Sequence, residues 1–194
     1  MALLAGQHVL VVDSETTGFD PNYGHRLIEV ATVSIVEGAL GEHWSSLVRP
    51  GRSIPSDATA VHGLSDAELR EAPAPDVVAA ELRRRCDDRV LVFHNVGFDL
   101  PFLTALLRET GQPRLLNPIV DTLGLSRELE EAGGHSLEIL AARLELPPPS
   151  FHRALPDAVT TAHVFLALAA RWEARGVRSL AELAALSQDA LRSG

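Results

Sequence analysis

The sequence predicts an α/β protein in which a single mixed β-sheet is covered by helices. Two features of the order of segments predict this class. Three β-rich segments come first and are joined by short turns, which is typical of an antiparallel hairpin or meander. After them, strand-like segments alternate with helical ones, which is typical of parallel strands connected by helices. We expect both parts to belong to one sheet.

Five segments are expected to be strands. The first, HVLVVD (8–13), is a β-rich apolar run that ends in an acid, as expected for a buried strand. The second covers 26–38 and the third 43–50, with the glycine-bounded turn EGALGE between them. RVLVFHN (89–95) is the fourth, and a short fifth strand leads into a helix within 115–129.

Capping residues and periodicity predict the helices. Ser65 and Glu68 have capping-box spacing at the start of a helix that we expect to continue to Cys86. The next helix is expected over 98–111, with Pro101 in its first turn, where a missing N–H costs little. Further helices are expected over 136–146, 156–176 and 177–192.

Length and composition predict one soluble domain. The chain has 194 residues, of which 46% are hydrophobic and 22% charged. We expect residues 1–175 to form the functional domain and residues 176–194 to form a helix packed on it. The apolar stripe of that helix consists of Leu180, Leu183, Ala184 and Leu191.

Charge and apolar runs exclude several classes of protein. The formal net charge is −9 without a single lysine, which argues against a protein that coats nucleic acid by neutralising many phosphates. It leaves open an enzyme that binds a few nucleotides. We find no apolar run long enough to cross a membrane and no basic region of a signal peptide, so we expect a cytoplasmic protein. The single cysteine, Cys86, excludes an intrachain disulfide and a multi-thiolate metal site.

Four acids are expected to meet at one edge of the sheet. Asp13 and Glu15 follow the first strand, and they point the same way because strand side chains alternate. Asp99 follows the fourth strand, and Asp157 begins the longest helix. Sites of open α/β sheets form outside the carboxyl ends of strands, so all four can converge there. Each acid alone has an ordinary role at a strand end or helix start; together they repel unless cations lie between them.

The ligand chemistry predicts the ions and the reaction. Oxygen-only ligands favour a hard divalent ion, Mg²⁺ or Mn²⁺. Two such ions about 3.5–4 Å apart are the known arrangement for in-line displacement at phosphorus. We therefore expect two divalent ions held by the four acids, and hydrolysis of phosphodiester bonds as the reaction.

His152 is the candidate general base. It precedes Asp157 by five residues, and Pro156 favours a helix that begins near Leu155. We therefore expect His152 in the loop before this helix, within reach of the ions. Its unperturbed pKa of about 6.5 suits the removal of a proton from the attacking water. Taken alone, the residue is better described as a surface-loop histidine, and only its place beside Asp157 favours the catalytic role.

Three segments resemble the motifs of a known family. VVDSETTGFD, HNVGFDLPFL and HRALPDA resemble, in this order, the exonuclease motifs of the DnaQ-like (DEDDh) 3′→5′ exonucleases, the family of the proofreading epsilon subunits of bacterial DNA polymerase III. TAVHGLSDAEL, VDTLGLSREL and HSLEILAARLEL resemble connecting segments of that family. The resemblance covers the chain to about Arg175.

The resemblance implies a fold and a set of site residues. It implies a ribonuclease H-like sheet in the order 3-2-1-4-5 with strand 2 antiparallel, the four acids as metal ligands, and His152 as the base. It also implies residues that hold the terminal nucleotide or line the cleft, namely Thr16, Thr17, Gly18, His62, Asn95 and Phe98. His62 equally fits a role in stabilising a turn, and Phe98 a role in the core. Asp121 matches an acidic position near the site.

These implications lead to one expected function and three alternatives. We expect a metal-dependent 3′→5′ exonuclease that releases nucleoside 5′-monophosphates from single-stranded or frayed DNA 3′ ends, in proofreading or repair. The alternatives are ribonuclease T-like trimming of RNA 3′ ends, a catalytically silent nucleic-acid-binding subunit, and a two-metal phosphatase acting on nucleotides. Association with a DNA polymerase is a weaker expectation, because replicative epsilon subunits carry a longer C-terminal tail and SQDALRSG is a poor clamp-binding motif.

Overall fold

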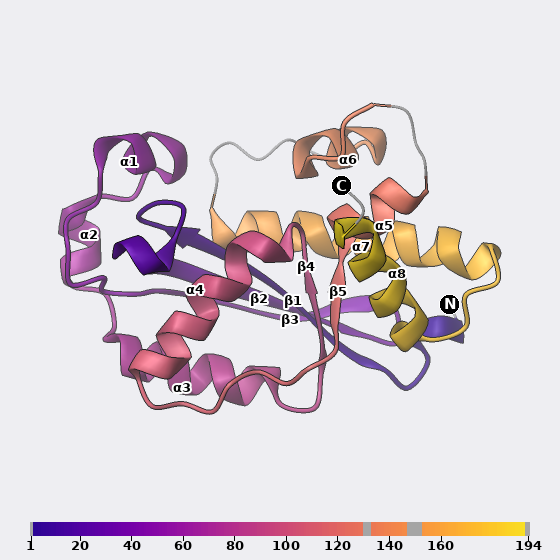
Figure 1. The fold of residues 1–194 in the computed structure, drawn as a ribbon, viewed down its shortest axis with the longest axis horizontal. Helices are drawn as coiled ribbons and strands as arrows, with labels where there is room; N and C mark the ends of the chain where they lie inside the picture. The colour runs from indigo at the N-terminus through magenta and orange to yellow at the C-terminus, as the bar shows by residue number, and fades with distance from the viewer. Residues whose placement is uncertain (1, 130–132, 147–152, 193–194) are drawn as a thin grey trace.

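A five-stranded mixed sheet forms the centre of the molecule (Figure 1). The computed structural model describes residues 2–129, 133–146 and 153–192. The strands are β1 (His8–Thr16), β2 (Leu27–Val36), β3 (Ala39–Leu47), β4 (Val90–Phe93) and β5 (Ile119–Asp121). Their order is β3-β2-β1-β4-β5; β2 is antiparallel to β1 and β3, whereas β4 is parallel to β1 and β5. The expected strand order is confirmed.

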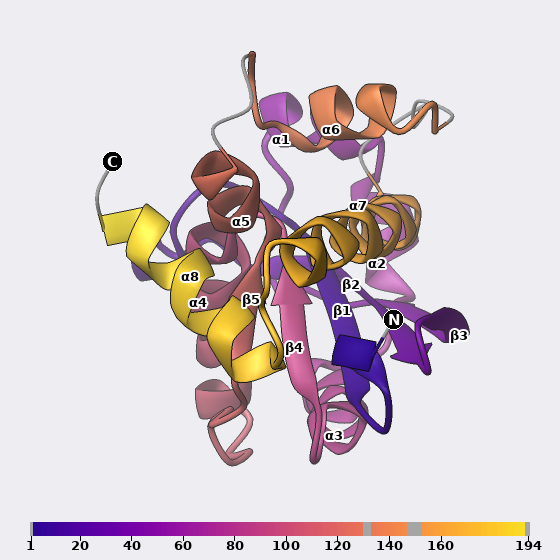
Figure 2. The ribbon, with the colours of Figure 1, turned by 90° about the vertical axis from the view of Figure 1, so that its right-hand side faces the viewer.

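Helices cover both faces of this sheet (Figure 1 and Figure 2). Helix α7 lies on one face with α5 and α8 beside it, and α3 and α4 cover the other. The helices are η1 (Ala2–Leu4), η2 (Pro21–Tyr23), α1 (Ser56–His62), α2 (Asp66–Arg70), α3 (Pro75–Cys86), α4 (Val96–Glu109), α5 (Thr122–Glu128), α6 (Leu137–Arg143), α7 (Ala154–Ala174) and α8 (Leu180–Arg192).

The alternation of side chains along β1 creates the two core layers. Val9 and Val11 pack in the layer that contains α7, whereas Leu10 packs in the layer that contains α3 and α4. Asp13 and Glu15 continue the series of Val9 and Val11. Their side chains therefore leave the strand on the face covered by α7.

The C-terminal helix α8 packs into the same core as α7. Leu180, Leu183 and Ala184 are buried there. The side chain of Leu191, expected on the same stripe, lies outside the side chains that the structure describes. Among the residues that the structure covers, no helix is both long and apolar enough to span a bilayer.

The prediction of one continuous helix from Ser65 to Cys86 is wrong, because the structure has two helices there. The capping box of Ser65 and Glu68 is present, but α2 ends at Arg70 and α3 begins at Pro75. Ala74 before this proline is extended, with φ −66° and ψ 148°. Proline disfavours the helical conformation of the residue before it, which separates the two helices.

Cys86 is buried at the end of α3, and burial raises the pKa of its thiol to about 12.

The expected position of Pro101 in a first turn is also wrong. Helix α4 begins at Val96, two residues earlier than expected, so Pro101 lies inside the helix. The start is set by Asn95, which has left-handed backbone geometry with φ 68°. The side chain of Asp121 accepts hydrogen bonds from the amides of Asn95 (2.9 Å) and Val96 (3.0 Å) and thereby fixes this start.

Candidate active site

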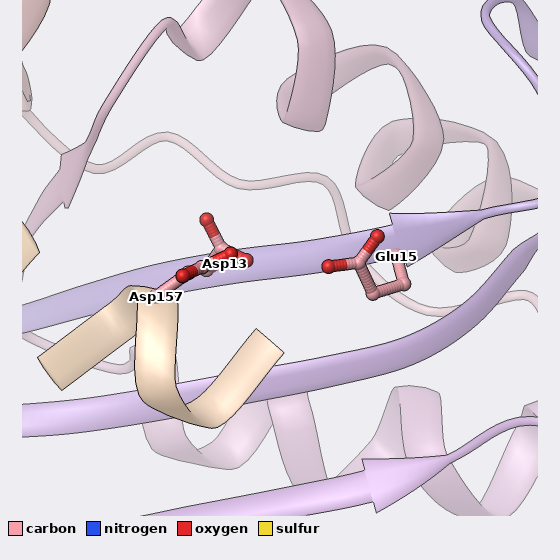
Figure 3. Close-up of side chains that lie close together, drawn as sticks. All are labelled: Asp13, Glu15 and Asp157. Carbon is pink, nitrogen blue, oxygen red and sulfur yellow. The ribbon is translucent and has the colours of Figure 1, made fainter. Parts of the chain in front are cut away.

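Two acids lie at the C-terminal end of β1. Asp13 pairs with Ala31 of β2 and Glu15 with Glu29, so both remain within the sheet. The register shifts between Glu15 and Thr16, where the strand ends. Both acidic side chains are half-buried. Figure 3 shows them projecting from the same strand.

Helix α7 adds a third acid from the far end of the sequence. Asp157 is buried in the first turn of α7. One carboxylate oxygen of each of Asp13, Glu15 and Asp157 lies within 4.8 Å of the others (Figure 3). Three oxygen donors this close suit a hard divalent cation, because hard ions take carboxylate oxygens and the ion cancels the repulsion. The residues therefore fit a divalent metal site.

Asp99 reaches the same cleft from α4. It is buried in the first turn of that helix. Its Oδ1 accepts a 2.6 Å hydrogen bond from Ser14 Oγ, so Asp99 is tied to the strand between Asp13 and Glu15. Burial raises the pKa of Asp99 to about 7, although the Ser14 hydrogen bond acts in the opposite direction.

The electrostatics of the acids reflect their mutual repulsion. Burial raises the pKa of Asp13 well above its ordinary range, and the charges of Asp99 and Asp157 raise it further. Burial, followed by the charges of Asp157 and Glu29, raises the pKa of Glu15 to about 8. The site therefore holds protons at neutral pH unless cations replace them.

The acids border an open cleft of about 540 Å³. One wall comes from β1 and the start of α4, and the opposite wall comes from α5, α6 and the segment before α6. The lining residues on that side are His94, which follows β4, and Leu123, Arg127, His135, Ser136, Leu137 and Glu138.

The three residues after Glu15 form a tight turn. Thr16 Oγ1 donates to the carbonyl of Gly18 (2.6 Å), and Thr17 Oγ1 accepts from the Arg26 amide (2.9 Å). A Cβ at Gly18 would lie 2.3 Å from the ring of His25. The two threonine side chains thus shape the turn, and only glycine fits at position 18 without displacing His25.

The other expected substrate residues differ in exposure. His62 is 2% exposed, and its Nδ1 accepts a 3.0 Å hydrogen bond from the Leu64 amide, in agreement with a role in the turn. Asn95 is exposed and lines the cleft. Phe98 lines the cleft and also packs against Phe102, with ring centroids 5.7 Å apart.

Asp121 has a positioning role within the fold. It is fully buried and accepts hydrogen bonds from three backbone amides, those of Asn95 (2.9 Å), Val96 (3.0 Å) and Leu123 (2.9 Å). It thereby holds the starts of α4 and α5 together. Because α4 carries Asp99, Asp121 positions one of the four acids.

Sequence reasoning missed two charged residues beside the site, and the position that it predicts for His152 stays a prediction. His152 lies outside the described residues, within 147–152. The missed residues are Glu29, which is buried in β2, and Arg153, which pairs with it. Glu29 interrupts an apolar strand, LIEVATVSIV, and a buried charge in such a position needs a partner. That signal identifies Glu29 but not the arginine that pairs with it.

Comparison with known proteins decides the family. The family described as Exonuclease matches residues 10–165. The chain belongs to this exonuclease family. Together with the sheet order and the relatives described next, the match identifies a DnaQ-like 3′–5′ exonuclease.

Two curated relatives and one solved structure illustrate the likeness. The DNA polymerase III subunit epsilon-like protein of Rhodobacter capsulatus is 41% identical over 173 residues, which are 87% of this chain but only 24% of that relative. The DNA polymerase III subunit epsilon of Rickettsia typhi is 34% identical over 166 residues, 82% of this chain and 72% of the relative. Exonuclease X in complex with 5′ overhanging duplex DNA shares the fold, with a TM-score of 0.73 and 24% identity over 92% of this chain and 99% of that one.

Proposed function

We propose that this chain removes nucleotides from single-stranded or frayed DNA 3′ ends and releases nucleoside 5′-monophosphates. The observation that carries the proposal is the group of three carboxylates within 4.8 Å, beside Asp99 and at the mouth of an open cleft. The family supports the 3′–5′ direction. The DNA bound to exonuclease X and the polymerase names of the relatives support DNA as substrate, and a role in proofreading or repair.

We assign the chemistry to residues of the DEDDh pattern. Asp13, Glu15, Asp99 and Asp157 would hold two divalent ions, Mg²⁺ or Mn²⁺, which supply activation of the attacking water and neutralise charge on the leaving oxygen. His152 takes the proton from that water. The turn 16–18, His62, Asn95 and Phe98 hold the terminal nucleotide so that its phosphodiester bond lies beside the acids.

We make three further assignments. We propose that residues 1–175 form the exonuclease domain and that 176–194 form a helix packed on it. Relatives named as subunits of DNA polymerase III support association with a polymerase. A protein that acts with a bacterial polymerase works in the cytoplasm, which supports that location.

Product analysis tests the substrate and the direction. DNA and RNA oligonucleotides of matched sequence, labelled at either end, are incubated with Mg²⁺ and then with Mn²⁺. We expect 5′-labelled DNA to give a ladder and 3′-labelled DNA to give a mononucleotide at once. Cleavage of RNA alone would support the trimming alternative. Intact oligonucleotides in both metals would contradict nuclease activity, and release of phosphate from mononucleotides would support a phosphatase.

The role of His152 has a matched control in the same region. His152→Ala should lower kcat by about 10²–10⁴-fold, the usual contribution of a general base. His163→Ala, in which an exposed histidine of α7 is removed, should leave kcat unchanged. Equal activity of the two variants would contradict the assignment of His152.

A further inference from the structure

Glu29 and Arg153 form an ion pair beside the carboxylate site. Glu29 lies on β2 directly opposite Glu15 and is 4% exposed. Arg153 Nε donates to Glu29 Oε2, and Arg153 Nη2 donates to Glu29 Oε1, both at 2.8 Å. This bidentate geometry fixes the orientation of the guanidinium relative to the carboxylate as well as the distance between them. The pair joins residues that are 124 positions apart.

The ion pair is connected to the first turn of α7. Glu29 Oε2 also accepts a 3.2 Å hydrogen bond from the Ala154 amide, and the Arg153 carbonyl accepts a 3.1 Å hydrogen bond from the Asp157 amide. The side chain of Arg153, at the N-cap position of α7, makes no capping hydrogen bond. Glu29 therefore supplies the negative group that a helix N-terminus favours. Arg153 is also the residue that follows His152 in the chain.

The pair also controls charge near the acids. Two glutamates opposite each other on one face of a sheet repel, and the charge of Glu29 raises the pKa of Glu15. Arg153 lowers the pKa of Glu15. The arginine thus allows a buried acid to anchor the helix without adding an uncompensated charge beside Glu15.

We propose that Glu29 and Arg153 are positioning residues of the metal site. The pair holds the first turn of α7 on β2, so that Asp157 lies within reach of the same ion as Asp13 and Glu15. This inference rests on the proposed function, because it assumes that the acids bind divalent ions. It does not require either member of the pair to touch the ion or the nucleic acid.

Arg85 offers a matched control on the other side of the sheet. Its Nε donates to Glu81 at 2.6 Å and its Nη2 donates to Glu42 at 3.0 Å, and its guanidinium lies over the Trp44 ring. The Arg85 side chain is 12% exposed, so its removal also breaks a partly buried ion pair. It joins α3 to β3 and does not line the cleft.

Mn²⁺ binding to the protein without nucleic acid tests the proposal. Free Mn²⁺ is measured by electron paramagnetic resonance, and thermal midpoints and kcat are measured in parallel. We expect Arg153→Ala to weaken Mn²⁺ binding by about 10–100-fold, the usual effect of losing a residue that orients a ligand. Arg153→Lys keeps the charge without the planar fork and should give an intermediate affinity. Arg85→Ala should lower the thermal midpoint and leave Mn²⁺ affinity unchanged.

The outcomes separate this inference from the proposed function. If Arg153→Ala lowers the thermal midpoint as Arg85→Ala does but keeps wild-type Mn²⁺ affinity, the pair is only structural and the inference is overturned. If Arg153→Ala does not fold, the test uses Arg153→Lys and Glu29→Gln instead, because each of these variants keeps part of the hydrogen bonding. Wild-type Mn²⁺ affinity in both variants overturns the inference. A wild-type protein that binds no Mn²⁺ overturns the proposed function itself.

Discussion

Ser14 and Asp99 are joined by a 2.6 Å hydrogen bond between β1 and α4. Ser14 lies between the two acids of β1, and its side chain points to the opposite face of the sheet. The hydrogen bond therefore sets the position of Asp99 relative to both of them. It also favours the ionised form of Asp99 and so opposes the effect of burial; with both effects present, the pKa of Asp99 is raised to about 7.

Ser14→Ala should shift the pH dependence of hydrolysis. Without the donor, the pKa of Asp99 rises above about 7, so a larger share of Asp99 is protonated in mildly acidic solution. We expect about a tenfold loss of kcat/KM near pH 6, in line with a hydrogen bond to a charged group worth about 1.5–3 kcal/mol, and a smaller loss above pH 8. Ser34→Ala removes another buried serine hydrogen bond of the sheet and should leave the profile in place. A parallel drop at every pH would contradict the role of Ser14.

The metal-free protein should become less stable as pH rises. The pKa of Glu15 is raised from 4.5 to about 8 and that of Asp99 from 3.8 to about 7, so the folded protein keeps protons that the unfolded chain has lost. The contribution of these two acids to stability is therefore full below about pH 4, falls through the interval up to about 8, and is lost above it. Mg²⁺ should raise the thermal midpoint more at about pH 8.5 than at about pH 6, because it takes the place of those protons. Equal thermal midpoints of the chelator-treated protein at about pH 6 and about pH 8.5 would contradict the repulsion between these acids.

Asp13→Asn should make the metal-free protein more stable and the enzyme less active. The substitution removes a half-buried charge that the charges of Asp99, Asp157 and Glu15 all repel. We expect the metal-free thermal midpoint at about pH 8.5 to rise by about 2–4 °C, which corresponds to about 1 kcal/mol in a protein of this size. Hydrolysis should fall about a thousandfold, because metal ions contribute several kcal/mol to such reactions. Asp88→Asn, at an exposed position, should change neither property. A variant with lower stability and normal hydrolysis would place Asp13 outside the site.

Local patterns in the sequence were sufficient for most of the sheet and for the acids of β1. The alternation of β1 predicts that Asp13 and Glu15 share a face, because that rule depends only on neighbouring residues. The strand order came instead from the family resemblance, since pairing between distant strands leaves no local signal. The bonds of Asp121 and the Glu29–Arg153 pair likewise depend on tertiary contacts between segments far apart in the chain. Sequence periodicity does not contain that information.

Asp121→Asn should loosen the start of α4 and reduce hydrolysis through Asp99. The two oxygens of Asp121 accept three backbone amides in a fully buried position, and an amide group keeps only one of those acceptors. We expect the free energy of unfolding to fall by about 2–3 kcal/mol, since buried donors are left without an acceptor. In urea unfolding, Asp20→Asn is the control: Asp20 accepts a single exposed amide, that of Asn22, and asparagine caps a helix as well as aspartate does. Hydrogen exchange should accelerate at the amides of residues 95 and 96 in the Asp121 variant only. Unchanged exchange there, with unchanged stability, would show that the three bonds are not what holds α4 in place.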